Sequence, residues 1–94
     1  MSKIDNYQKV IENTQEKIEK YKLLVEKIDK NDAASQQLLA KYKKGNGSNN
    51  KIDAEESKLA HNAKKRIQVL KNIEEFKTVI SKYEGYIQRE KNNA

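Results

Sequence analysis

The chain has 94 residues and a formal net charge of +6, and its charged residues (36%) slightly outnumber its hydrophobic ones (35%). A chain of this length forms one small domain at most, and so low an apolar content excludes a large globular core. Cysteine and proline are both absent, which excludes disulfides and thiolate metal sites and removes the strongest helix breaker.

The sequence carries no membrane or signal segment. No apolar run approaches the ~20 residues that cross a bilayer, and the residues after Ser2 are polar, unlike the apolar core of a signal peptide. We therefore expect a protein without a membrane span, located in the cytoplasm. Export without a cleaved leader is the alternative.

The first half of the chain has an apolar repeat of seven residues. One series consists of Ile4, Ile11, Ile18, Val25, Asp32 and Leu39. A second series, three residues further on, consists of Tyr7, Thr14, Tyr21, Ile28, Ser35 and Tyr42. Two such series are typical of a helix that packs along a seam. They predict a helix over residues 3–43, with Ser2 as its cap and Gly45 just beyond its end.

Residues 44–52 are rich in glycine and asparagine and are expected to form a turn. Beyond them, Asp53 and Glu56 have the spacing of a capping box, which predicts a second helix over residues 53–91. Its heptad series consists of Ile52, Leu59, Arg66, Ile73, Ile80 and Ile87. Because so short a turn makes its helices antiparallel, the fold class is all-α: a single domain, residues 1–94, formed by a coiled-coil-like two-helix hairpin.

Folding the chain at this turn places residue i opposite about residue 96 − i, so the apolar series of the two helices face each other. We expect the core to contain Ile18, Val25, Leu70, Ile73 and Ile80. The stripe is wider than two helices need. Its flanking apolar residues are Val10, Leu24, Leu38, Leu70, Val79 and Tyr86. A stripe this wide is what bundles of three or more helices bury, which predicts a homodimeric four-helix bundle.

One layer of the predicted seam is polar. Asp32 and Ser35 occupy seam positions of the first helix, with Asn62 and Arg66 roughly opposite. A polar layer can fix the register or the choice of partner at some loss of stability. The alternative is a break of the helix at residues 31–32.

Groups for catalysis or metal binding are sparse. His61 is the only histidine, and although Ser57 lies one turn before it, no third member of a triad and no oxyanion hole are evident. No Glu-x-x-His motif suggests a metal site within a bundle. We therefore expect no enzyme activity, no metal, no cofactor and no small-molecule substrate.

Positive charge gathers at the predicted turn. Residues 41–66 contain eight basic and three acidic residues, a net charge of +5 out of +6 for the chain. The candidate binding residues are Lys41, Tyr42, Lys43, Lys44, Lys51, Lys58, Lys64, Lys65 and Arg66. A basic tip favours contact with an acidic surface. We expect a non-catalytic interaction module (an adaptor, inhibitor or regulatory subunit) that binds a protein partner through this tip or a bundle flank.

Two alternative functions stay open. The lysines could bind nucleic acid without sequence specificity, with Tyr42 stacking on a base. In addition, Tyr86 and Glu90 match the Tyr-x-x-x-Asp/Glu pattern found after the helical hairpin of type VII secretion substrates. With its length and two-helix pattern, the chain resembles the ESAT-6/WXG100 family, which implies export without a cleaved leader. The family's Trp-x-Gly turn is replaced here by Gly45-Asn46-Gly47.

Overall fold

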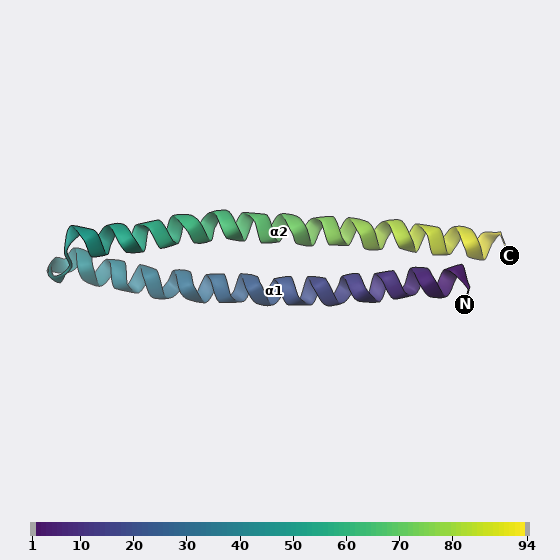
Figure 1. Cartoon of the computed structure of the whole chain (residues 1–94), viewed down its shortest axis with the longest axis horizontal. Coiled ribbons are helices and arrows are strands. Elements are labelled where there is room, and N and C mark those ends of the chain that lie inside the picture. Colours follow the sequence, from purple (N-terminus) through teal and green to yellow (C-terminus); the bar gives the residue numbers. More distant parts are fainter. Residues whose placement is uncertain (1, 94) are drawn as a thin grey trace. The chain divides into compact units, whose positions relative to one another are not determined.

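The computed structural model describes residues 2–93 and consists of two long helices with a short link. Helix α1 spans Lys3–Lys41, helix α2 spans Asn49–Asn92, and the π-helical turn η1, Tyr42–Asn46, lies between them (Figure 1). No β-strand occurs among residues 2–93. The all-α fold and the helical hairpin are therefore confirmed. Residues 1 and 94, the ends of the predicted domain, lie outside the described residues.

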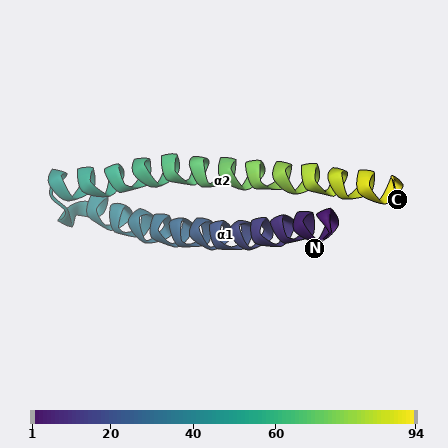
Figure 2. The same ribbon diagram turned by 45° about the vertical axis from the view of Figure 1, so that its right-hand side comes forward.

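The described residues fall into two compact units that share both helices. Residues 2–22 and 70–93 form the terminal unit, and residues 23–69, with the turn, form the tip unit. In the terminal unit the purple start of α1 runs antiparallel to the yellow end of α2 (Figure 1). In the tip unit the teal ends of the helices meet at the turn (Figure 2). Each unit is a pair of antiparallel helical segments with its own seam.

Serine hydroxyls cap both helices. The Ser2 hydroxyl accepts a hydrogen bond from the backbone N–H of Asp5 (3.2 Å), as the sequence predicts. At α2, the Ser48 hydroxyl accepts from the N–H of Lys51 (3.4 Å), so the expected start at residue 53 is corrected to Asn49. The predicted capping residue Asp53 lies inside α2, because Ser48 is an equally good cap and no helix breaker follows it.

The link between the helices is a tight turn. Helix α1 ends at Lys41, two residues before the expected position, and the N–H of Gly47 donates to the carbonyl of Tyr42 (3.3 Å). Gly45 has a φ of +134°, which residues with a side chain rarely adopt. The predicted helix end at a positive-φ glycine is confirmed. The turn itself is shorter than the predicted one, residues 44–52, because α2 begins early.

The seam follows the heptad repeat of α1 at every position. All twelve residues of its two series are buried or half-buried. The predicted series of α2 also lies in the seam, together with a second series that consists of Glu55, Asn62, Val69, Phe76, Tyr83 and Glu90. Tyr21 contacts Phe76 and Asp32 contacts Asn62, so the register agrees with the predicted one within two residues.

Burial in the seam matches four of the five residues predicted for the core. Ile18 and Ile73 are buried, and Val25 and Ile80 are half-buried. Leu70 is 38% exposed, which corrects the prediction. The neighbouring Val69 holds the seam position instead, so the Leu70 side chain points past the seam.

Aromatic rings fill much of the seam of the terminal unit. Tyr7 packs against Tyr83 and Tyr86, with ring centroids 5.7 and 5.5 Å apart. Tyr21 meets Phe76 edge-on at 5.0 Å. These separations lie within the range in which aromatic pairs attract beyond their burial. Large rings therefore compensate for the small number of aliphatic residues in this part of the seam.

Candidate interaction surface of the tip unit

All nine predicted binding residues lie in the tip unit, but they form two groups. Lys41 ends α1, Tyr42, Lys43 and Lys44 belong to η1, and the others lie on α2. A helix rises 1.5 Å per residue, which places Lys64 about 20 Å along α2 from Lys51. One group therefore surrounds the turn, and the other lies beside the polar layer. They do not form one continuous basic prong.

Tyr42 and two lysines of the turn group have structural partners. The Nζ of Lys51 lies 5.7 Å from the centroid of the half-buried Tyr42 ring, within cation–π range. The Nζ of Lys43 lies 3.6 Å from a carboxylate oxygen of Glu56. Tyr42 thus belongs to the packing of the turn. Within residues 2–93, Lys41 and Lys44 are exposed and make no ion pair.

The second group borders the polar layer that the sequence predicts. The Asn62 amide nitrogen donates to an Asp32 carboxylate oxygen (2.9 Å), and Arg66 Nε donates to Asp29 (2.9 Å). Helix α1 continues through residues 31–32, so the alternative of a helix break is wrong. Arg66 is held by its ion pair. Within the described residues, the exposed Lys64 and Lys65 make none.

Glu55 is a buried carboxylate that the sequence reading did not place in the seam. Only 5% of its surface is exposed, and Lys58 Nζ lies 3.2 Å from its Oε1 atom. A hydrogen bond from the Ser35 hydroxyl, assisted by Lys58, lowers the pKa of Glu55 below its ordinary value despite the opposing effect of burial. Its spacing of seven from Asn62 could have revealed its place in the seam.

Replacing Glu55 by glutamine should make the free energy of unfolding less dependent on pH. Because its pKa is lower in the folded chain than in the unfolded chain, the ionised carboxylate stabilises the fold at pH values above the unfolded pKa. That contribution is lost as the pH falls through the folded pKa. We expect Glu55→Gln to be less stable than the wild type at pH 7 and nearly equal to it in acid, as urea unfolding at several pH values can show. An equal difference at every pH would contradict this account of Glu55.

A hollow of about 400 Å³ opens beside the polar layer. Its lining residues are Asn31, Ser35, Ser57, Lys58, His61 and Asn62. Ser57 and His61, the pair considered above for catalysis, both line it, but no hydrogen bond joins them in the described part of the chain. Nor do residues 2–93 contain a group of three histidine, cysteine or acidic side chains that could hold a metal ion. The hollow is mainly a place where amide, hydroxyl and ammonium groups reach solvent.

The tail motif that resembles type VII substrates lies inside α2. Tyr86 packs against Tyr7 and Tyr83, and a carboxylate oxygen of Glu90 lies 4.0 Å from the Nζ of Lys3. Both motif residues therefore have packing roles in the terminal unit.

Comparison with protein families, curated proteins and solved structures finds no match to this chain. Neither helix among the described residues is long and apolar enough to cross a membrane. The functional argument therefore depends on the surfaces of the chain itself.

Proposed function

We propose that the chain is a non-catalytic interaction module whose helices pack against further helices, with a homodimeric four-helix bundle as the smallest assembly. The observation that supports this proposal is the exposure of large apolar side chains. Ile67 is 69% exposed and Leu23 56%, and Leu24, Leu38 and Leu70 each expose more than a third of their surface. Two helices cover only one stripe of each other, so these residues stay in contact with water until more helices cover them.

Light scattering over a range of protein concentrations tests this proposal. We expect the mean mass to exceed the monomer in the micromolar range and thermal unfolding to shift to higher temperature with concentration, because association stabilises the folded state. A monomer at high micromolar concentration, with a melting temperature independent of concentration, would remove the basis for a four-helix bundle.

The partner class that we favour is protein, and the module would serve as an adaptor, inhibitor or regulatory subunit. Helix packing supports this choice, because the exposed side chains are leucine and isoleucine, which an amphipathic helix can cover. We place this activity in the cytoplasm, consistent with a chain that has no cysteine.

A second candidate function, nucleic-acid binding, is favoured by the four lysines of the tip unit that have no ion-pair partner among residues 2–93: Lys41, Lys44, Lys64 and Lys65. Each can contact a phosphate and release a counterion, so affinity would fall steeply with salt. Lysine presents a point charge, which suits binding without sequence specificity.

Replacing these four lysines by glutamine tests that candidate. If they contact phosphate, retention of the chain on a labelled duplex should fall at least tenfold, and the dependence of log affinity on log salt should become shallower by about four contacts. The control replaces Lys9, Lys20, Lys71 and Lys91, which lowers the net charge equally outside the tip unit. Equal losses in both variants would show that net charge alone attracts nucleic acid.

A further inference from the structure

The terminal unit has two sides of opposite charge. We call the side that contains Val10 and Val79 the basic flank, and the side across the seam that contains Ser81 and Glu84 the acidic flank. By heptad position, the charged residues of the basic flank are Lys3, Lys17, Lys20, Lys82, Arg89 and the single acid Glu75. Those of the acidic flank are Asp5, Glu12, Glu19, Glu74, Glu84, Lys22, Lys77 and Lys91. The net charges are +4 (five basic, one acidic) and −2 (three basic, five acidic).

Several charges on each flank are unpaired within the described residues. On the basic flank, Lys20, Lys82 and Arg89 make no ion pair. On the acidic flank, Glu19 pairs with Lys22 and Glu74 pairs with Lys77, each within its own helix. The carboxylates of Asp5, Glu12 and Glu84 make no ion pair among residues 2–93. Each flank therefore offers three free charges of one sign.

The basic flank also has an apolar groove of about 410 Å³. Its lining residues are Val10, Thr14, Lys17, Phe76, Val79, Lys82, Tyr83 and Tyr86. Val10, Val79 and Tyr86 are half-buried, and the Nζ of Lys17 lies 6.0 Å from the centroid of the Phe76 ring. The groove thus combines an apolar floor with ammonium groups at its edges.

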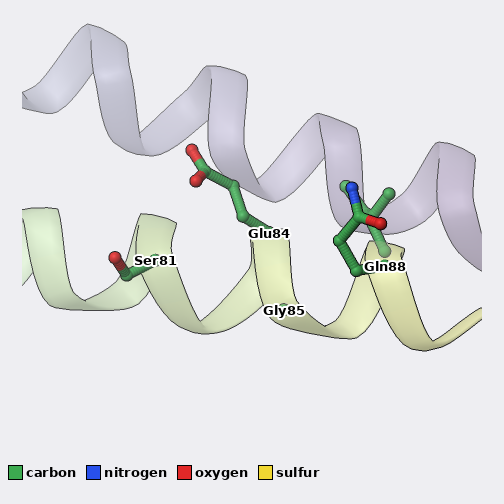
Figure 3. Close-up of a pocket in the computed structure, with 5 residues that line it drawn as sticks. Ser81, Glu84, Gly85 and Gln88 are labelled. Atoms are coloured by element: carbon green, nitrogen blue, oxygen red, sulfur yellow. The ribbon is translucent and has the colours of Figure 1, made fainter.

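The acidic flank has a hollow of about 490 Å³ where α2 has small residues. Figure 3 shows Ser81, Glu84, Gly85 and Gln88 on consecutive turns of α2, with the side chains of Glu84 and Gln88 extending toward α1 in this view. Ile87 completes the lining, and a Cβ atom added at Gly85 would meet no atom within 4 Å. This flank therefore has open space beside an apolar side chain, with a carboxylate at its edge.

We infer that the occupant of the basic flank is a second copy of the chain, which docks through its acidic flank. This inference rests on the proposed self-association and adds which surfaces meet. Opposite charges attract across such a contact, whereas the basic flanks of two copies, or the acidic flanks of two copies, would repel. The register is compatible, because the free charges of both flanks occupy the same lengths of helix: residues 5–20 of α1 and 82–89 of α2.

A contact between two different flanks does not close on itself. After one contact, the first copy still has a free acidic or basic flank, and the second copy has the opposite one. The four helices of a dimer are therefore a segment of a stack that grows with concentration. Because the contact depends on charge, added salt should shorten the stack.

Two variants of the full chain test this inference. The first neutralises the basic flank with Lys20→Gln, Lys82→Gln and Arg89→Gln, and the second neutralises the acidic flank with Asp5→Asn, Glu12→Gln and Glu84→Gln. By sedimentation velocity, the wild type should grow past the dimer with concentration. Each variant alone should associate at least tenfold more weakly. An equimolar mixture should regain association and stop at a dimer, because it contains only one intact pair of flanks.

The control replaces Lys9, Lys64 and Lys71 by glutamine, which gives the net charge of the first variant while leaving both flanks intact, and it should associate like the wild type. A wild type that stops at a dimer, with either flank variant unaffected, would overturn the stacking inference and leave the proposed four-helix bundle in place. A monomeric wild type at all concentrations would overturn both and assign the flanks to a different protein.

Discussion

Ile73→Ala should lower the free energy of unfolding by about 2–5 kcal/mol, as truncations of large aliphatic core residues do. Ile73 is 5% exposed, and its position is the centre of the apolar series of α2. The truncation removes buried methyl and methylene groups, and two straight helices cannot move together locally to fill the space. Urea unfolding followed by circular dichroism at 222 nm measures the loss.

Ile67→Ala provides a matched control for this prediction. Ile67 lies on the same helix, but 69% of its surface is exposed, so its truncation should change the free energy of unfolding of the monomer by at most about half a kcal/mol. Lys71→Ala, at another exposed position, should be equally mild. If Ile73→Ala proves as harmless as these two changes, the seam does not lie where the heptad repeat places it.

The seam of α1 could be predicted from the sequence because the spacing of seven overrides the chemistry of individual residues. Asp32 and Ser35 are polar, yet both lie in the seam where the repeat places them. A helix keeps its phase along its whole length, so a few strong positions such as Ile18 and Ile28 determine the orientation of the rest. The antiparallel register followed from the short turn alone.

Glu55 shows where sequence patterns mislead. Its carboxylate, near the start of a helix, has a sufficient explanation in the positive helix end, and that explanation hid its seam position. Its burial depends on Ser35 of the other helix and on Lys58, and such a cross-helix hydrogen bond leaves no trace in the local sequence. The early start of α2 was missed for a similar reason, since Ser48 and Asp53 are both good caps and only the structure distinguishes them.

The candidate surface was only partly predictable. Counting charges along the chain places the excess at the tip, but a linear count cannot separate the two sides of a helix. Once the seam is known, Lys43 and Arg66 are seen to pair across it with Glu56 and Asp29, which removes them from the free charge of the tip. The same knowledge reveals the opposite charges of the two flanks, because residues three or four apart share a side and their neighbours do not.

Gly47→Ala should lower the free energy of unfolding by about 1–3 kcal/mol, as other insertions of a methyl group into a packed site do. A Cβ atom at Gly47 would lie 2.9 Å from the Tyr42 Cα atom and in closer contact with the Tyr42 Cβ and Cγ atoms. Tyr42 cannot easily give way, because its carbonyl accepts the Gly47 N–H and the Nζ of Lys51 lies over its ring. The methyl group must therefore open the turn that joins the helices.

Gly85→Ala makes the same chemical change in the middle of α2, where the added Cβ meets no atom within 4 Å. Alanine is favoured over glycine by about 1 kcal/mol inside a helix, so this variant should be more stable than the wild type. Urea unfolding of both variants, at concentrations low enough to keep the chain monomeric, separates the two effects. A Gly47→Ala variant as stable as the wild type would show that the turn does not need the close contact between Gly47 and Tyr42, and that the hairpin is held by its seam alone.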